Sequence, residues 1–263
     1  MTTGSVLKFE NVDLIRDQNS ILKNISFETK FNQHLVILGP NGAGKTSLIE
    51  IAAGFQFPSA GKVEILGKVM GKTDLNQLKL SIGYAGSRLN LIMDPNEKVF
   101  DAVISAAYGI VGRWREVYSS FDIARAAQVL ELMGMSGYRE RQYGNLSAGE
   151  RKKVDIARAL MNDPELLILD EPAASLDLPS REDLLHQLDE LINSGFSPAL
   201  VMVTHHIEEI PNGFNQALLL NNGEVFAKGD IESTLSEESL SNLYGFNIRV
   251  VNTEGRRFAY RRA

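Results

Sequence analysis

Short segments of β-forming residues, separated by turn residues, occupy the first quarter of the chain. Residues 6–11, 24–29 and 62–66 each alternate or cluster such residues, and glycines interrupt the chain around them. The segment 34–38 differs, because four consecutive apolar residues follow its histidine, which is the pattern of a buried strand. This segment leads directly into a glycine-rich loop, and residues 47–53 are predicted to continue as a helix.

The middle of the chain changes to helical spacing. Residues 97–161 are rich in Ala, Leu, Arg and Glu, and we interpret about 88–160 as a helical insertion between two strands. The later elements predicted are a strand at 166–170, a helix at 181–193, a strand at 199–204 and a strand pair around 221–223. Apolar strands that alternate with helices imply a mostly parallel sheet covered on both faces, and hence an α/β fold.

The length and composition fit one large α/β domain over residues 1–263, with a C-terminal strand or tail at about 230–263. Apolar residues make up 44% of the chain, which is enough for a substantial core, and no cysteine is present. Disulfides and cysteine-zinc sites are therefore excluded, and a reducing compartment fits. The net charge of −6 argues against a nucleic-acid partner.

Five arginines nevertheless gather near the C-terminus, and we interpret them as belonging to a solvated tail or an edge strand with protective charge. They are Arg249, Arg256, Arg257, Arg261 and Arg262. No signal peptide and no apolar stretch approaching the ~18 residues of a membrane span are visible. We therefore expect a cytoplasmic protein, peripheral on the cytoplasmic face of the membrane if it acts there through another chain.

The glycine-rich loop matches the P-loop pattern of glycine, four free positions, glycine-lysine and Ser/Thr. Its residues are Gly39, Pro40, Asn41, Gly42, Ala43, Gly44, Lys45 and Thr46, followed by Ser47. Glycines let backbone N–H groups wrap a phosphate, and the following helix adds a favourable dipole. Lys45 is expected to reach the β- and γ-phosphates, and the Thr46 hydroxyl to bind Mg²⁺. The alternative, a purely structural strand–turn–helix, is disfavoured by this context, so the loop predicts a nucleotide site.

Two acids, Asp170 and Glu171, end the apolar strand at 166–170. Ligands of parallel sheets bind beyond the carboxyl ends of the strands, so we expect these acids beside the loop. Asp170 is placed to hold Mg²⁺ through water, and Glu171 to polarise an attacking water. The alternative is a solvated Asp-Glu turn ahead of Pro172.

Ser147 and Glu150 have the spacing of a capping box that opens a helix running through Leu160. This interpretation needs no function. However, a helix N-terminus that exposes Gly149 is also suited to bind an anion. The segment alone does not decide between the two.

The order of these motifs resembles that of the ABC (ATP-binding cassette) ATPases over nearly the whole chain. It comprises the P-loop, Leu146–Glu150, Asp170-Glu171, Ser175-Leu176-Asp177 and Thr204-His205. The resemblance implies a P-loop NTPase core with an N-terminal antiparallel β subdomain, ATP and Mg²⁺ as ligands, and ATP hydrolysis with Glu171 as base. It also implies a head-to-tail homodimer around two ATP. Ser147 and Gly149 would act on the partner's nucleotide, Asp177 would lie in the loop that crosses the dimer, and His205 would contact the γ-phosphate.

The chain departs from the family pattern at several positions. Ala148 and Glu150 stand where Gly and Gln are usual, and Ser87 stands where a glutamine normally lies near the transmembrane partner. Arg16 occupies the position of the adenine-stacking aromatic; it could stack on the base or be a solvated loop residue. Tyr108 and Trp114, in an unfamiliar part of the insertion, are interpreted as core.

Two functions follow. The first is the energising subunit of a membrane transporter with a separate transmembrane chain. The second, suggested by Ser87, is a soluble ABC ATPase that regulates or remodels a protein. DNA-repair or translation ATPases fit poorly, because the acidic chain is short and has no nucleic-acid footprint.

Overall fold

The computed structural model describes residues 4–86, 93–113, 115–194 and 197–262. The chain forms two compact units. Unit 1 comprises Met1–Lys79 and Ala199–Ala263, and unit 2 comprises Leu80–Pro198. Both ends of the sequence therefore build unit 1, and the middle of the chain builds unit 2.

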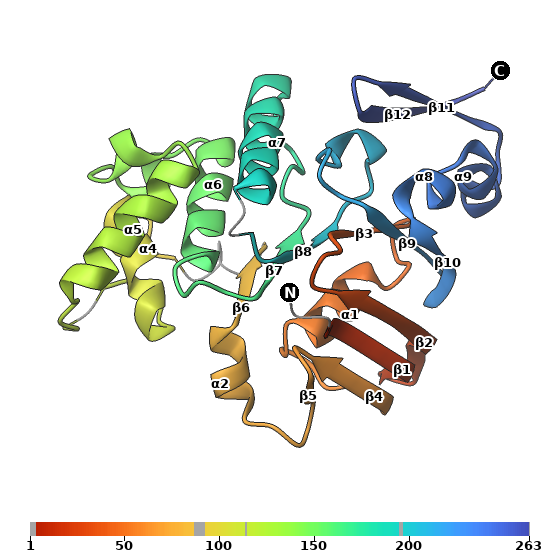
Figure 1. Cartoon of the computed structure of the whole chain (residues 1–263), viewed down its shortest axis with the longest axis horizontal. Coiled ribbons are helices and arrows are strands. Elements are labelled where there is room, and N and C mark those ends of the chain that lie inside the picture. The colour runs from red at the N-terminus through yellow and green to blue at the C-terminus, as the bar shows by residue number, and fades with distance from the viewer. Residues whose placement is uncertain (1–3, 87–92, 114, 195–196, 263) are drawn as a thin grey trace. The chain divides into compact units, whose positions relative to one another are not determined.

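An antiparallel sheet forms the N-terminal part of unit 1, with the strand order β2-β1-β4-β5. Its strands are β1 (Ser5–Arg16), β2 (Asn19–Lys30), β4 (Ala60–Ile65) and β5 (Lys68–Val69). Figure 1 shows β1, β2 and β4 side by side. Phe9 of β1 pairs with Phe27 of β2, and their rings stack with centroids 4.7 Å apart. The predicted N-terminal antiparallel β subdomain is confirmed.

A second set of strands in unit 1 has the order β10-β9-β3-β8. These are β3 (Leu35–Leu38), β8 (Ala199–Val203), β9 (Gln216–Asn221) and β10 (Glu224–Asp230). β3 is parallel to β8 and to β9, and β9 turns tightly into antiparallel β10. Every residue of β3 and β8 is buried, which explains their unbroken apolar sequences. Helix α1 (Lys45–Ala52) follows β3 and packs Leu48 and Ile49 into the core.

The C-terminal part of unit 1 ends in a two-stranded antiparallel sheet. Its elements are η4 (Ile207–Glu209), α8 (Ile231–Thr234), α9 (Glu237–Tyr244), β11 (Ile248–Thr253) and β12 (Arg256–Arg261). Arg257 is only 7% exposed and forms an ion pair with Glu232, and Arg256 donates to the carbonyl of Glu208. The interpretation of the C-terminal arginines as solvated or protective charge is therefore wrong for Arg257, whose burial is made possible by its carboxylate partner.

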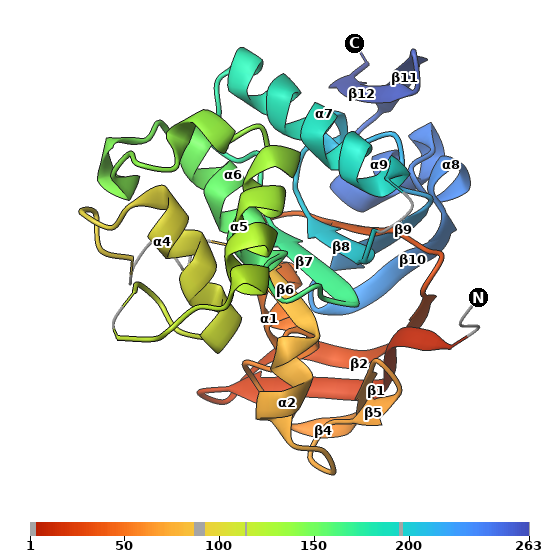
Figure 2. The ribbon, with the colours of Figure 1, turned by 60° about the vertical axis from the view of Figure 1, so that its left-hand side comes forward.

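Unit 2 contains the helical insertion that the sequence predicted, between two parallel strands. The strands are β6 (Ile82–Ala85) and β7 (Leu166–Asp170). Helix α2 (Leu75–Leu80), which belongs to unit 1 except for Leu80, precedes β6 in the sequence. The helices are α4 (Val99–Ile104), η1 (Ser105–Tyr108), α5 (Ser120–Leu132), η2 (Ser136–Tyr138), η3 (Tyr143–Asn145), α6 (Ala148–Ala159) and α7 (Leu178–Asn193). Figure 2 shows α4, α5 and α6 gathered together. Helix α6 also packs against β6 and α7, so it is the centre of the unit.

Tyr108 corrects one expectation about this insertion. Its side chain is 52% exposed, and its hydroxyl donates to the carbonyl of Val117 at 3.0 Å. The interpretation of Tyr108 as core is wrong, because a phenol at the end of a short 3₁₀ turn can satisfy its hydroxyl at the surface. Trp114 lies outside the described residues. Across the parts of the chain that the structure describes, none of the helices has the length and apolar character that a membrane crossing requires.

Candidate nucleotide site

The predicted phosphate loop lies between the buried strand β3 and the start of α1, as its chemistry requires. Gly44 is the N-cap of α1 and provides no side-chain hydrogen bond, and no acid stands in the first turn. Neither the N-cap nor the first turn of this helix therefore supplies a negative charge, which favours an external anion there. Thr46, in the first turn, is exposed.

Lys45 is folded back onto its own loop. Its Nζ donates to the carbonyl oxygens of Gly39 at 2.8 Å and Pro40 at 3.0 Å, and the residue is 6% exposed. A buried ammonium needs hydrogen-bond partners, and the loop carbonyls supply them. Contact of this ammonium with phosphate oxygens stays a prediction.

The β9–β10 hairpin supports the phosphate loop from the side. The Gly223 N–H donates to the carbonyl of Ala43 at 3.1 Å. A side chain at Gly39 would place its Cβ 2.1 Å from the carbonyl oxygen of Leu220, so only glycine fits there. The loop's shape is thus fixed by backbone contacts with a neighbouring hairpin as well as by its own glycines.

His205 follows β8, in a turn held by two buried polar residues. Thr204 is fully buried and its hydroxyl donates to Glu209, which is 5% exposed. The N–H of His206 donates to the Thr204 hydroxyl at 3.1 Å, and the rings of His205 and His206 lie 4.2 Å apart. The turn therefore holds the half-buried His205 at the end of a parallel strand.

Arg16, at the end of β1, is also in unit 1. Its guanidinium donates to Gln56 at 2.8 Å and lies 3.7 Å from a carboxylate oxygen of Glu50. Its side chain is 54% exposed, so its planar group is accessible while two neighbours hold it. Stacking on adenine remains a prediction.

Asp170 and Glu171 end β7 in unit 2. Asp170 is 9% exposed and accepts a hydrogen bond from the Tyr84 hydroxyl at 3.1 Å. Tyr84 was not predicted as part of the site; its place on the neighbouring strand β6 brings it to Asp170. The contact orients one carboxylate oxygen of Asp170.

Glu171 has an unusual backbone conformation. Its φ is 49°, in the left-handed region, although the next residue, Pro172, favours an extended predecessor. Such a conformation costs about 1–3 kcal/mol and persists only where the surroundings enforce it. Its carbonyl oxygen accepts hydrogen bonds from the Ala174 N–H at 3.3 Å and from the Lys152 ammonium at 3.1 Å.

The predicted capping box at the start of α6 is confirmed. The Ser147 hydroxyl accepts from the Glu150 N–H at 3.3 Å, and the Glu150 carboxylate accepts from the Ser147 N–H at 2.7 Å. The hydrogen bonds to Ser147 and Tyr138 hold the pKa of Glu150 below its usual value, although burial opposes this. Ser147 itself is exposed, so the start of the helix is accessible.

Gly149 and Asp177 meet at a single residue, Ser180. A Cβ at Gly149 would lie 2.8 Å from the Ser180 Cβ, so α6 and α7 approach closely there. Asp177 is the N-cap of α7 and accepts from the Ser180 N–H at 3.2 Å. Hydrogen bonds from Ser180 lower the pKa of Asp177. The structure thus brings Asp177 next to Gly149 through Ser180. Gly149 itself is buried, so the expectation that the start of this helix exposes it is wrong, because α7 packs against it.

A buried acid on α6 was missed by sequence analysis. Asp155 is 2% exposed and accepts a hydrogen bond from the Tyr143 hydroxyl at 2.8 Å. Burial raises the pKa of Asp155 to about 6, although Tyr143, Lys152 and Arg158 act in the opposite direction. Its position between Val154 and Ile156, which are both buried, was the available signal: a carboxylate within an apolar run must find a partner.

The residues expected to hold Mg²⁺ have suitable chemistry. Mg²⁺ prefers hard oxygen ligands and is usually held by one or two carboxylates together with substrate phosphates. Thr46 offers a hydroxyl and Asp170 a carboxylate, and Tyr84 orients the latter. Within residues 4–86, 93–113, 115–194 and 197–262, no cluster of three or more His, Asp or Glu could hold a metal by itself. Taken singly, the Thr46 hydroxyl and the Asp170 carboxylate are each a donor type that Mg²⁺ binds together with phosphate oxygens.

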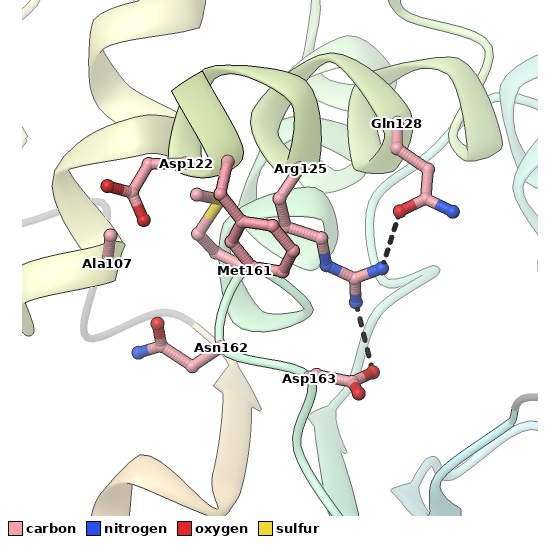
Figure 3. A pocket seen from close by; sticks show the side chains of 8 residues that line it. Ala107, Asp122, Arg125, Gln128, Met161, Asn162 and Asp163 are labelled. Carbon is pink, nitrogen blue, oxygen red and sulfur yellow. Dashed lines mark hydrogen bonds and ion pairs between the residues drawn. The ribbon is translucent and has the colours of Figure 1, made fainter. Parts of the chain in front are cut away.

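A cavity of about 310 Å³ lies in unit 2 among residues that sequence analysis did not assign. It is lined by Ala107, Phe121, Asp122, Arg125, Gln128, Met161, Asn162 and Asp163 (Figure 3). Arg125 donates to Gln128 at 2.9 Å and forms an ion pair with Asp163 at 3.3 Å. None of the predicted nucleotide residues lines this cavity.

Ser87, which stands where the family usually has a glutamine, lies outside the described residues.

Comparisons with known proteins identify the family. The family model of the ABC transporter matches residues 22–174. The ABC transporter ATP-binding protein YlmA of Bacillus subtilis is 39% identical over 257 residues, covering 97% of each chain. The manganese transport system ATP-binding protein MntB of Halalkalibacterium halodurans is 31% identical over 243 residues, covering 92% of this chain and 93% of MntB.

Solved structures show the same fold. An ATP-binding cassette of an ABC transporter has a TM-score of 0.79 at 23% identity, covering 92% of this chain and 99% of the other. A dimeric bacterial ABC transporter cassette has a TM-score of 0.74 at 24% identity, covering 86% and 99%. These likenesses confirm the predicted α/β P-loop fold. The chain therefore belongs to the ABC transporter family and is an ATP-binding cassette that hydrolyses ATP.

Proposed function

We propose that two copies of this chain bind two ATP with Mg²⁺ between them and energise a membrane transporter, at its cytoplasmic face, through a separate transmembrane chain. The observation that carries the proposal is the presence, in one chain, of a phosphate loop on buried β3 and an exposed, capped start of α6, where Leu146–Glu150 forms the signature segment and α6 the signature helix. The family relationship and the transport names of relatives such as MntB support it.

Nucleotide binding is assigned to the phosphate loop. The Lys45 ammonium would exchange the carbonyl oxygens of Gly39 and Pro40 for β- and γ-phosphate oxygens. The N–H groups at the start of α1 would donate to the phosphates. Arg16, held by Gln56 and Glu50, would stack on the adenine base.

Hydrolysis is assigned to Glu171 as the base that accepts a proton from the attacking water, with His205 contacting the γ-phosphate. Thr46 and Asp170 would hold Mg²⁺, which neutralises negative charge that develops on the phosphates. The Tyr84 hydroxyl would keep the Asp170 carboxylate oriented. The strained backbone of Glu171 supports its assignment, because strain of this kind gathers at functional residues.

The second copy would complete each nucleotide site. Ser147 and Asp177 are exposed and lie at the starts of adjacent helices, with Gly149 packed on Ser180 between them. Together they form one surface, with a helix N-terminus suited to a phosphate. We assign this surface to the ATP held by the partner's phosphate loop.

The assignments predict distinct behaviour for two variants. Glu171→Gln should lower the rate of ATP hydrolysis by a factor of about 10² to 10⁴, the usual contribution of a general base, and accumulate as a dimer with ATP and Mg²⁺.

Lys45→Ala should lose nucleotide binding, because the ammonium that would contact the phosphates is removed. Phosphate release, nucleotide titration and gel filtration measure these outcomes, with Glu254→Gln in the exposed β11–β12 turn as control. Unchanged ATP affinity in Lys45→Ala, or a Glu171→Gln variant that stays monomeric with ATP, would contradict the proposal.

Four exposed large apolar side chains lie between residues 108 and 123 of unit 2, and we assign them to a surface for a protein partner. Its members are Tyr108 (52% exposed), Val117 (87%), Phe121 (77%) and Ile123 (48%). Phe121 also lines the cavity of Figure 3, so an apolar side chain of a partner could enter beside it. Large apolar side chains exposed together commonly mark interaction sites.

Co-purification tests this surface. Phe121→Asp combined with Val117→Asp should release the cassette from the membrane fraction and from its integral membrane partner, because a carboxylate cannot be buried in an apolar contact. ATP hydrolysis by the purified cassette should stay within about twofold. Phe258→Asp, an equally drastic change on exposed β12, is the control. A wild-type chain found only in the cytosol, with no integral membrane chain attached, would instead favour a soluble regulatory ATPase.

A further inference from the structure

Lys152 connects the signature helix to the backbone of the proposed catalytic base. It lies on α6, slightly more than one turn after the N-cap Ser147, and is partly buried. Its Nζ donates to the carbonyl oxygen of Glu171 at 3.1 Å. A lysine ammonium is a strong donor, and hydrogen bonds from charged groups are about twice as strong as neutral ones.

The hydrogen bonds to Glu171 fix the direction of its carbonyl group. One comes from the Ala174 N–H at 3.3 Å and closes a turn, and the other comes from Lys152. Both donors bind the same carbonyl oxygen, which has two acceptor positions. Because φ of Glu171 is 49° ahead of Pro172, the residue would otherwise relax toward an extended backbone. Such a relaxation would redirect the Glu171 side chain.

Lys152 is itself part of a polar chain that begins beside the signature. Tyr143, just ahead of the signature segment, donates to the buried Asp155 at 2.8 Å. The charge of Lys152 acts on Asp155, as do those of Arg158 and Arg151. Lys152 lies three residues from Asp155 on the same helix, so one ammonium interacts with both Asp155 and the carbonyl of Glu171.

We propose that Lys152 is a positioning residue that holds the backbone of Glu171 in its left-handed conformation and so couples the signature helix to the base. The inference rests on the proposed function, in which Glu171 serves the ATP of its own chain and the signature serves that of the partner. Lys152 then links the two nucleotide sites of the dimer within one chain.

Kinetics of Lys152→Met test this role. We expect kcat for ATP to fall about tenfold, as for loss of a hydrogen bond from a charged group, while KM changes less than twofold. Lys152→Arg, which keeps a cationic donor, should recover most of the loss. Lys98→Met, which removes an exposed lysine that pairs with Glu140 in the same unit, is the control. A kcat equal to that of the wild type, or a failure of arginine to rescue, would overturn the inference.

A double-mutant cycle with Glu171→Gln separates positioning from general loss of structure. Measured in single turnovers, Lys152→Met should cost about tenfold in the wild type but less than twofold in the Glu171→Gln background. An equal cost in both backgrounds would show that Lys152 acts elsewhere. If Glu171→Gln alone hydrolyses ATP normally, the proposed function fails instead. If Lys152→Met does not fold, Lys152→Gln, which removes the charge and shortens the reach, takes its place with the same outcomes.

Discussion

Asp155 is a carboxylic acid in the interior of unit 2, and its partner is a tyrosine hydroxyl. Burial raises its pKa to about 6, compared with about 3.9 in an unfolded chain. The folded protein therefore binds a proton more tightly than the unfolded one. The stability gained from this proton is fully present below about pH 4 and is lost as the pH rises through 6.

Asp155→Asn should remove this pH dependence, because an amide keeps an acceptor for Tyr143 without a charge. Between pH 5 and 7.5, the free energy of unfolding of the variant relative to the wild type should rise by about 1–2 kcal/mol. Urea denaturation at both pH values measures the difference. A difference that does not change with pH would contradict the burial of a titrating acid at this position.

At the scale of elements, the β9–β10 hairpin is a support for the phosphate loop. Its Asn222-Gly223 turn has φ values of 49° and 81°, which is the two-residue hairpin turn that this dipeptide favours. A Cβ at Gly223 would lie 2.4 Å from the carbonyl oxygen of Ile21. The Gly223 N–H holds the carbonyl of Ala43 in the phosphate loop.

Gly223→Ala should therefore destabilise the protein and weaken ATP binding together. The left-handed conformation alone costs about 1–2 kcal/mol with a side chain, and the contact with Ile21 adds to it. Gly71→Ala is a matched control, because its φ is 83° and nothing lies near its Cβ position. Thermal unfolding and nucleotide titration compare the two variants. Equal losses of stability, with ATP affinity unchanged in both, would show that the hairpin does not shape the loop.

Elements with strong local signals were predictable from sequence. The capping box placed the start of α6 at Ser147, and the unbroken apolar runs located the buried strands β3 and β7. The helices of the insertion were less predictable, because its uniformly helical composition does not mark where one short helix ends and the next begins. Tyr108, in a 3₁₀ turn of the insertion, was predicted to be core because an aromatic residue is more often core than interface, whereas tertiary structure leaves it exposed.

At the scale of the whole molecule, the order of motifs was sufficient to predict the family and the fold. The contacts that refine the site were not predictable, because they join residues far apart in sequence. Tyr84 reaches Asp170 across 86 positions, and Lys152 reaches Glu171 across 19. Neither has a local pattern. The burial of Arg257 is of the same kind, since its partner Glu232 lies in a different element.

The contacts of Lys45 with Gly39 and Pro40 bear on how the cassette resets after each turnover. A buried ammonium without a partner would destabilise the protein by about 3–5 kcal/mol. If only nucleotide could pair with this ammonium, the loop would bind the product of hydrolysis tightly. Here the loop's own carbonyl oxygens receive the ammonium. Incoming nucleotide must displace these carbonyl oxygens from the Lys45 ammonium, so it binds less tightly than it would to a loop without these contacts. Departing nucleotide is replaced by these oxygens at once. We therefore predict that nucleotide release leaves no unpaired ammonium, so the cycle can begin again without rebuilding the loop.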